Sequence, residues 1–458
     1  MTAEEVYLKY PDEKVVGFFR GSQPELVIRD PEFMKRILVT HFHNFHGRGL
    51  LPNPTFVEPL LKNLFFADGD IWKLLRQRFS LAFSTGKVKA MFSFITERAE
   101  KLQMLTEEVA QLESYDAREL MARYTTDFIG ACGFGIDMDT LNDEKSIFRQ
   151  IGQRIFKRTP YDAIRAVLKY TFPDLCKNIT LLTPELETSM NYLVNSVLQQ
   201  RNNESTGRND FIDLMIELRK QGKIVTESMT ERNADGTPKM IELDFSNPLL
   251  VSQVFLFFGA GFETSSTASS HTLHQLAYNK KYQRKVQEEL DGILKKYDNK
   301  ITYDAVIEMN YLEKAFYESL RMYPPVAYLI RQCSSKYTFP EIDLTIDEGV
   351  RVVMPIKAMF NDEKYFKNAH LYNPDRFATL KDMKNNLFIP FGDGPRTCVA
   401  ARLGLMQSLA GLAAVLHKFD VEPSSKSIFR PTPDPTGTVS ENFVDGLPLK
   451  FTKRKQST

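Results

Sequence analysis

Hydrophobic positions repeat with a helical period through most of the chain. Between about residue 70 and residue 325, apolar side chains recur every three to four positions, as they do on one face of an α-helix. The clearest segments are 70–83, 87–112 and 184–200, and Thr183 is the expected N-cap of the last. The pattern therefore predicts a mainly helical body.

Both ends of the chain also contain strand patterns. Residues 15–19 and 25–29 alternate like the arms of a hairpin, and Asp30-Pro31 then marks the start of a helix through Leu38. After residue 325 the pattern changes to short strands, interrupted by one helix at 401–417. The later strands are expected at 327–333, 337–339, 350–354 and 447–451.

One predicted helix is unusually long and apolar. It opens at Asn247-Pro248 and can run to Tyr278, which at 1.5 Å per residue is roughly 45 Å. A helix of this length and character should pass through the middle of the protein. The polar stretches 202–210 and 222–243 are interpreted as surface loops, and neither is distinct enough to be a linker. We therefore expect residues 1–458 to form a single domain, mainly α with a small β portion.

Composition narrows the function only slightly. The 458 residues are 43% hydrophobic and 26% charged, and the net charge of +1 gives no global field for nucleic acid. The four cysteines are scattered without CxxC pairs, so neither a disulfide framework nor a zinc site is indicated. The 34 phenylalanines suit a core and also a roomy apolar cavity. No run of 18 apolar residues and no signal peptide are visible, so we expect no spanning helix.

Residues 391–398 carry the strongest chemical signal. They read Phe-Gly-Asp-Gly-Pro-Arg-Thr-Cys, and a helix is expected after them. The glycines and the proline predict a tight turn that brings the Cys398 sulfur near a helix N-terminus, where the dipole favours a thiolate. Haem iron accepts such a thiolate as an axial ligand. Taken alone, a cysteine in this position is more often structural.

The spacing in this segment resembles the ligand loop of the cytochrome P450 family, Phe-x-x-Gly-x-Arg-x-Cys. The resemblance implies that Phe391 packs beside the sulfur, that Gly394 allows the turn, and that Arg396 pairs with a propionate. It also implies that Cys398 ligates the iron of haem b. Ala400 stands where the family usually has glycine, and its methyl group is expected to crowd the haem without removing the ligand.

The middle of the long helix carries a second motif, Ala260-Gly-Phe-Glu-Thr264. A glycine in a helix interior costs about 1 kcal/mol relative to alanine, and a threonine hydroxyl can bond a helix carbonyl. In isolation, small residues here would be interpreted as a helix–helix contact. The segment is similar to the family's distal motif, which implies a cofactor contact at Ala260 and room for dioxygen. It also implies that Thr264 steers the proton supply and that Glu263 relays protons from solvent.

Three further groups resemble family motifs. Glu318 and Arg321, with Arg376 as partner, resemble a structural trio of buried charges that fixes the cysteine loop. Trp72 and Arg76, four apart on one helix, resemble a pair that holds a haem propionate. A third propionate-binding arginine, at position 331, is implied in the same way. The motifs occur in the family's order, and the resemblance covers essentially the whole chain.

A closer resemblance, at 64–72 and 82–87, is to insect microsomal members that clear plant toxins and insecticides. It implies insertion of one oxygen atom from dioxygen into a bulky apolar substrate. Electrons would come from NADPH through a flavoprotein reductase, with cytochrome b5 as a second candidate donor. The resemblance also implies the cytosolic face of the endoplasmic reticulum membrane, and we interpret the missing N-terminal anchor as truncation.

Further expectations concern the substrate pocket, the docking surface and a group of histidines. The resemblance implies a substrate pocket lined from four segments, and a basic docking face for the reductase is hypothesised. The pocket segments are 56–66, 254–258, 326–330 and 439–444, and the docking residues are Lys73, Arg78, Lys87 and Lys89. His41, His43 and His46 could form a metal cluster, although a loop leading into the cavity is favoured because no ligand-spaced cysteine or carboxylate lies nearby.

Two other functions stay open. One is a haem-thiolate isomerase or dehydratase that acts on peroxides without a reductase. Against it stands the acid–alcohol pair Glu263-Thr264, which such enzymes tend to lack. The other is a non-catalytic protein that sequesters hydrophobic ligands.

Overall fold

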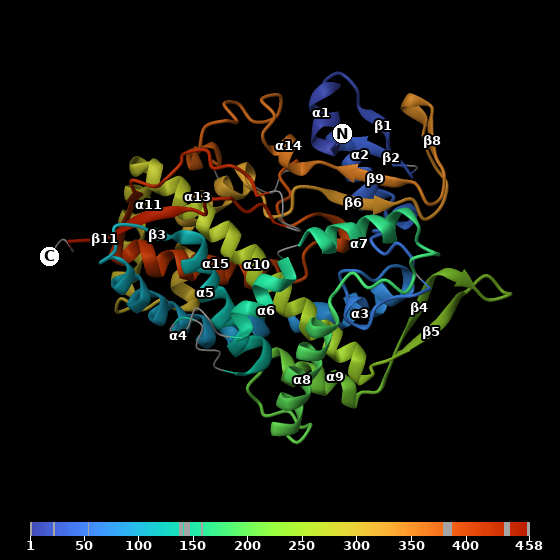
Figure 1. Ribbon diagram of the computed structural model, residues 1–458, viewed down its shortest axis with the longest axis horizontal. Coiled ribbons are helices and arrows are strands. Elements are labelled where there is room, and N and C mark those ends of the chain that lie inside the picture. The colour runs from blue at the N-terminus through green and yellow to red at the C-terminus, as the bar shows by residue number, and fades with distance from the viewer. Residues whose placement is uncertain are drawn as a thin grey trace.

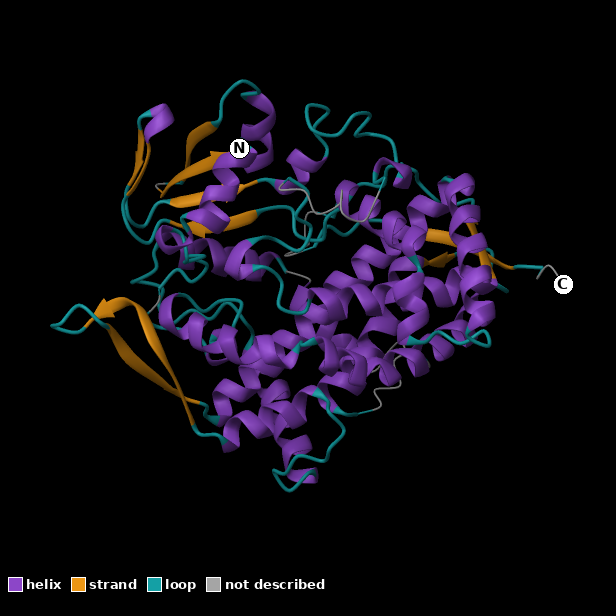
Figure 2. Cartoon of the chain, turned by 180° about the vertical axis from the view of Figure 1, so that it is seen from behind, coloured by secondary structure: helices purple, strands orange, loops and turns teal. Residues whose placement is uncertain are grey.

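The computed structural model describes residues 2–21, 23–53, 55–136, 141, 147–156, 159–378, 387–434 and 440–455. Figure 1 shows a mainly helical body with a small sheet region beside the N-terminus, and the C-terminus lies at the opposite end. Viewed from behind, the helices again form the larger part and the strands gather at the margins (Figure 2). The fold class therefore matches the prediction from the hydrophobic pattern.

The α-helices differ widely in length. They are α1 Ala3–Lys9, α2 Pro31–Lys35, α3 Gly69–Ala82, α4 Thr85–Val109, α5 Ala117–Ile129, α6 Ile147–Phe156, α7 Pro160–Thr171, α8 Pro184–Gln200, α9 Phe211–Lys220, α10 Asn247–Tyr278, α11 Lys280–Lys296, α12 Tyr303–Glu308, α13 Asn310–Met322, α14 Ile356–Phe360 and α15 Ala401–Lys418. The bounds of α3, α8, α10 and α15 agree with the sequence periodicity to within a residue or so. Asp30 caps α2 as expected, its carboxylate accepting from the amides of Glu32 and Phe33.

The strands form small sheets around this body. They are β1 Val15–Arg20, β2 Gln23–Ile28, β3 Tyr115–Asp116, β4 Lys223–Arg232, β5 Pro238–Asp244, β6 Leu329–Gln332, β7 Tyr337–Phe339, β8 Leu344–Ile346, β9 Arg351–Met354, β10 Phe419–Pro423 and β11 Pro448–Lys453. The largest sheet has the order β1-β2-β9-β6, in which β2 and β9 are parallel and the other pairs antiparallel. This sheet joins the first residues of the chain to the segment that precedes the cysteine loop.

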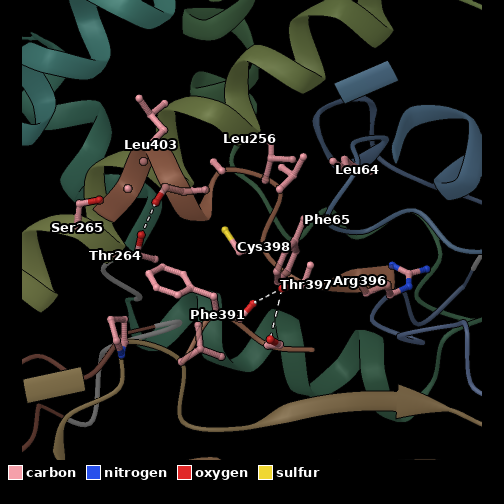
Figure 3. Close-up of a pocket in the computed structure, with 18 of the residues that line it drawn as sticks. Leu64, Phe65, Leu256, Thr264, Ser265, Phe391, Arg396, Thr397, Cys398 and Leu403 are labelled. Carbon is pink, nitrogen blue, oxygen red and sulfur yellow. Dashed lines mark hydrogen bonds between the residues drawn. The ribbon is translucent and has the colours of Figure 1, made fainter. Parts of the chain in front are cut away.

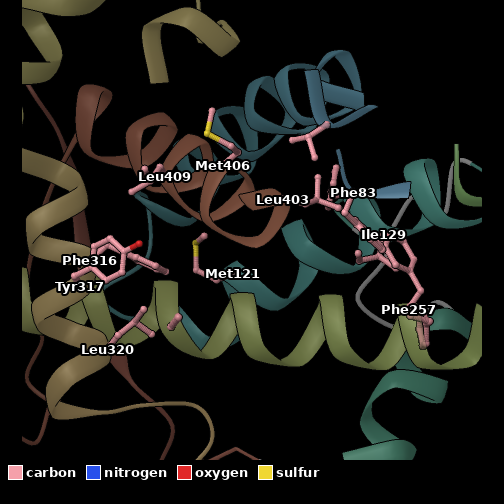
Figure 4. Packing of buried hydrophobic residues seen from close by; sticks show 14 of the residues in the cluster. Phe83, Met121, Ile129, Phe257, Phe316, Tyr317, Leu320, Leu403, Met406 and Leu409 are labelled. Carbon is pink, nitrogen blue, oxygen red and sulfur yellow. The ribbon is translucent and has the colours of Figure 1, made fainter. Parts of the chain in front are cut away.

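Helix α10 is the centre of the hydrophobic core. It packs against α5, α13 and α15, and most of its side chains are buried around the full circumference. Figure 4 shows the side chains that fill the space between these helices, among them Met121 of α5, Phe257 of α10, Phe316 of α13 and Met406 of α15. A helix that is apolar on all sides is stable only when it is enclosed in this way.

By length and composition α10 could also cross a membrane, and it is the one such helix among the described residues. However, 78% of its most apolar window is buried inside the protein. Several of its hydroxyls bond back to the helix itself, for example Thr264 Oγ1 to the Ala260 carbonyl and Thr272 Oγ1 to the Ala268 carbonyl, both at 2.8 Å. This back-bonding lets polar residues lie in the core without external partners.

The prediction of a surface loop at 222–243 was wrong. The segment forms the antiparallel hairpin β4–β5, which projects from the body in Figure 1. Its buried positions, Ile224, Thr226 and Ser228, alternate with exposed ones, but two of the three are polar and the hydrophobic signal is therefore weak. The hairpin lies against α3, where Asp70 accepts from the Ser228 hydroxyl and the Met229 amide, both at 2.6 Å.

The close packing of α15 against α5 leads to a stability prediction. A Cβ added at Gly411 would lie 2.6 Å from a ring carbon of Tyr124, so Gly411→Ala should lower the free energy of unfolding by about 1–3 kcal/mol. Gly292 on α11 faces open space, and Gly292→Ala should instead stabilise by up to about 1 kcal/mol through helix propensity. Thermal denaturation of both variants measures this, and equal midpoints would contradict it.

Candidate active site

A cavity of about 360 Å³ lies between α3, α10, α13, β6 and the loop that contains Cys398. Its wall is mainly apolar and includes Phe65, Phe79, Phe83 and Phe257. The view in Figure 3 places the Cys398 sulfur between Thr264 on one side and Arg396 on the other. The structure thus brings together residues that are more than 300 positions apart in the sequence.

Cys398 presents its sulfur to this cavity from just before α15. The Cys398 amide donates to the Phe391 carbonyl at 2.8 Å, and Arg76 donates to the Thr397 carbonyl at 2.7 Å. Burial raises the pKa of the Cys398 thiol above its ordinary value, and the Ala400 amide and the charges of Arg76 and Arg48 offset only part of this rise. These are the surroundings in which binding to a cation converts a thiol to a thiolate. Each of the four cysteines is free, as predicted.

The turn before the cysteine requires a glycine at position 394. Gly394 has a φ of +69°, and a Cβ there would lie 1.9 Å from the Leu38 carbonyl oxygen. Ala400, by contrast, has a φ of −102°, so its methyl group imposes no backbone strain. The replacement of the usual glycine is therefore compatible with the local backbone, and Ala400 lines the cavity.

Four arginines converge on one side of the cavity: Arg48, Arg76, Arg331 and Arg396. One nearby carboxylate, Asp68, accepts from Arg396 at 2.7 Å. Burial lowers the pKa of Arg48 to about 10, and burial with repulsion from Arg48 lowers that of Arg396 to about 9. The buried Nη1 of Arg396 and Nε of Arg331 have no hydrogen-bond partner in the described part of the chain. The site therefore has an excess of buried cationic donors.

This excess fits the two propionates of a haem group. Guanidinium groups bind carboxylates through paired donors, and an anionic ligand would relieve the mutual repulsion of the arginines. Trp72 lies beneath Arg396, with the guanidinium carbon 4.4 Å from its ring centroid. The apolar wall suits a flat porphyrin ring, and Cys398 supplies the donor for its iron. The residues present thus fit a haem-thiolate group.

Arg48 was not identified from the sequence. It lies in the loop after His46, and its guanidinium stacks on Phe65 at 4.5 Å. The only local signal is an arginine between two glycines, which is too common to interpret alone. The same loop contains the three histidines considered as a metal cluster. No metal-binding group of His, Cys, Asp or Glu is found among the residues described, whereas Arg48 and Leu50 line the cavity.

On α10, Ala260, Gly261 and Thr264 line the cavity, but Glu263 does not. A Cβ on Gly261 would lie 2.3 Å from Ile129 Cδ1, so this glycine also permits the contact between α10 and α5. The small residues therefore serve the helix–helix packing as well as the cavity. The two hypotheses weighed for this motif are compatible in the structure.

Glu263 is buried in a network of its own. Arg118 at the start of α5 donates to its carboxylate at 2.6 Å, Asn442 donates at 3.3 Å, and Ser440 also donates to it. Burial alone would raise the pKa of Glu263, but these contacts lower it below its usual value. Arg118 lies 145 positions earlier in the chain, and nothing local in the sequence marks it.

The trio of charges forms as the resemblance implied. Glu318 accepts from Arg321 at 2.9 and 3.0 Å and from Arg376 at 2.8 and 3.0 Å, and the Glu318 and Arg321 side chains are fully buried. Both arginines also donate to backbone carbonyls between 360 and 371. An aromatic cluster continues from here to the cysteine loop, since Tyr317 contacts the rings of Phe388 and Phe391.

Not all residues expected to line the substrate pocket do so in the structure. Of segment 254–258 only Leu256 and Phe257 line the cavity, whereas all of 326–330 except Ala327 does. Leu64 and Phe65 also line it, but Phe56 is surface-exposed. Residues 440–444 do not line it, and Val439 falls outside the described residues. Among the hypothesised docking residues, Lys73 donates to the Glu227 carbonyl and Lys89 pairs with Asp304.

Comparison with known proteins agrees with this geometry. The sequence model of the family described as Cytochrome P450 matches residues 4–442. The chain belongs to the cytochrome P450 family, whose members are haem-thiolate monooxygenases.

Its relatives include insect proteins. It is 35% identical to Cytochrome P450 6B7 of Helicoverpa armigera over 429 residues, covering 93% of this chain and 82% of that protein. It is also 35% identical to Cytochrome P450 6a2 of Drosophila melanogaster (89% and 80% covered). Cytochrome P450 6k1 of Blattella germanica is 32% identical, with 97% and 86% covered.

Removal of the Glu318 carboxylate should cause the protein to lose its haem group. Glu318→Ala leaves the fully buried Arg321 and the partly buried Arg376 without their carboxylate, and breaking a buried ion pair typically costs about 3–5 kcal/mol. We expect loss of bound haem, measured as the ratio of Soret to protein absorbance after purification. Glu341→Ala removes a carboxylate from a partly exposed pair with Arg36 and serves as control. Normal haem content in the Glu318 variant would contradict the assigned role.

Proposed function

We propose that this protein uses haem b to insert one oxygen atom from dioxygen into bulky, weakly polar organic molecules. The observation that carries the proposal is a single arrangement. A cysteine sulfur faces an apolar cavity whose far side holds an excess of buried arginines. A flat dianionic cofactor with a metal at its centre satisfies both features at once. Bound there, haem supplies the iron at which dioxygen is activated.

The chain's own residues hold and orient this group. Cys398 would supply the thiolate that binds the haem iron, with the Ala400 amide donating to its sulfur. Arg396, Arg76 and Arg331 would bind the propionates, and Arg48 joins this set although the sequence did not indicate it. Trp72 supports the Arg396 guanidinium from below. Phe391 and Gly394 would keep the sulfur loop in its turn.

Proton delivery would depend on the neighbouring pair Glu263 and Thr264. The Thr264 hydroxyl donates to the Ala260 carbonyl and keeps its oxygen toward the cavity. It is thus placed to accept a hydrogen bond from a proton donor and to hold that donor at the cavity. Glu263 lies on the other side of α10, where Arg118 keeps its carboxylate ionised. We propose that Glu263 exchanges protons with solvent through this network.

The cavity lining indicates the substrate class. Phe65, Phe79, Phe83 and Phe257 surround a space with few polar groups, which suits a bulky apolar molecule. Plant toxins and insecticides are the proposed substrates because the sequence resembles insect microsomal members with those roles.

A membrane location has support from an exposed surface. Helix α7 carries Tyr161, Ile164 and Val167 at 67%, 59% and 65% exposure, and Leu175 beyond it is 84% exposed. Apolar side chains at this spacing form one face of an amphipathic helix, which suits insertion into the headgroup region of a bilayer. We propose the cytosolic face of the endoplasmic reticulum as this membrane.

Electrons would come from NADPH through a flavoprotein reductase, with cytochrome b5 as an alternative donor. A basic surface is the expected docking site for an acidic flavoprotein. Lys73 and Lys89 are already bonded within the chain, so Arg78 and Lys87 are the stronger candidates of the original four. Lys87 makes only a 3.3 Å contact to the Asn209 amide oxygen.

The decisive test is the carbon monoxide difference spectrum of the reduced protein, followed by turnover with NADPH and reductase. We expect a band typical of haem-thiolate proteins, its loss in Cys398→Ala, and substrate oxidation that requires NADPH. Peroxide rearrangement without NADPH would indicate the isomerase or dehydratase. Absence of haem in protein that still binds apolar ligands would indicate the sequestering function. Either result would overturn the proposal.

The role of Thr264 can be tested against a matched threonine. Thr264→Ala should lower product formed per NADPH consumed by on the order of 10²-fold, with oxygen released as peroxide instead. Thr272 makes the same 2.8 Å back-bond two turns along α10 but does not line the cavity. Thr272→Ala should therefore leave the coupling ratio unchanged. Equal coupling in both variants would remove Thr264 from the proton path.

A further inference from the structure

A second cavity of about 320 Å³ lies where α10 and α13 end, among the residues that the structure describes. Gln275 and Asn279 contribute from the end of α10, and Tyr323 follows α13. The segments 367–376 and 429–430 close the other sides. It shares no lining residue with the first cavity, so it is not an extension of the haem site.

The charges that line this cavity are all basic. Lys367, His370, Arg376 and Arg430 contribute to the wall, and no described aspartate or glutamate does. Lys367 and Arg430 form no ion pair with any residue in the described ranges. Arg376 belongs to the trio around Glu318, in which two guanidinium groups share one carboxylate and leave one positive charge over.

This basic lining exceeds what the fold itself needs. The C-termini of α10 and α13 each carry the equivalent of about half a negative charge, which nearby cations stabilise. Glu363, bonded to His370 at 3.0 Å, adds one more negative charge beside the cavity. Lys367, Arg430 and the trio contribute about three positive charges, and the two helix ends with Glu363 offset about two of them. A surplus of about one positive charge remains, and Lys367 and Arg430 are free to bind a ligand.

The rest of the wall has polar and apolar parts. Gln275, Asn279 and Tyr282 contribute amide and hydroxyl groups, whose donors already bond to His274, the Gln275 carbonyl and Asn373. Leu371 and Phe429 line the same cavity and are 52% and 50% exposed, with the Phe429 ring 5.0 Å from that of Tyr278. Large apolar side chains at the mouth of a polar, basic cavity can cover the apolar part of a bound anion.

We propose that this cavity binds a small organic anion, in which a phosphate or carboxylate is attached to an aromatic or apolar group. Lys367 and Arg430 bind the anionic oxygens, and Phe429 and Leu371 cover the apolar part. The segment 367–376 also carries Arg376, which holds Glu318 and thereby the support of the cysteine loop. Occupancy of this cavity therefore stabilises the haem-bound protein against heat.

The test uses the haem-loaded protein with phenyl phosphate, phenylacetate, inorganic phosphate and phenol as probes. Calorimetry gives the dissociation constants, and the Soret difference spectrum shows separately whether a probe enters the haem cavity. We expect phenyl phosphate or phenylacetate to bind without a Soret shift and to raise the melting temperature. Phosphate should bind more weakly, because it lacks the apolar part, and phenol should not bind here.

The double variant Lys367→Gln/Arg430→Gln should weaken binding of the aromatic anion by at least about tenfold, since it removes both charge-assisted contacts. Lys300→Gln/Lys426→Gln removes the same charge from exposed positions that do not line the cavity, and it should bind normally. Equal affinity in the two double variants would overturn the proposal. Binding that always shifts the Soret band would do the same, because it would place the probe in the haem cavity.

Discussion

One fully buried carboxylate organises the supporting side of the cysteine loop. Glu318 binds two arginines, and these in turn bind the carbonyls of the segment between 360 and 371. Buried charges tolerate such a position only when every partner is present, so the arrangement is rigid. The aromatic rings of Tyr317, Phe388 and Phe391 continue this rigidity to the loop itself. The sulfur is thus positioned in part by residues that do not line the cavity, namely Glu318, Arg321 and Arg376.

The side of the cavity that α10 forms is organised differently from the cysteine loop. Here α10 must be apolar on all sides to lie in the core, yet it must also carry an acid and an alcohol. Thr264 meets both demands by bonding back to its own helix, and Glu263 does so through Arg118. Adjacent side chains consequently face different surroundings, one the cavity and the other a buried polar network. The proposed proton path through Glu263 and Thr264 depends on this separation.

The sequence correctly predicted those elements whose formation depends on residues close together in the chain. The long helix, the hairpin at the start and the turn before Cys398 follow from periodicity and from glycine and proline placement, and the structure contains all three. Arg48 and Arg118 were missed because no spacing rule connects them to their partners, which lie 17 positions away for Arg48 and 145 positions away for Arg118. The hairpin β4–β5 was mistaken for a loop because its buried face is largely polar. Long-range electrostatics and polar packing are therefore what the sequence pattern failed to reveal.

The attachment of that hairpin has a consequence for protein engineering. Asp70 and Lys73 of α3 are both bonded to β4, and the same turn of α3 carries Trp72. A chimera that exchanges residues 223–244 with those of a relative would break these bonds unless the first turn of α3 were exchanged as well. The two segments are joined by bonds between residues 154 to 159 positions apart, and they behave as one exchangeable unit. A recombination boundary placed between them would disturb the proposed cofactor pocket from outside.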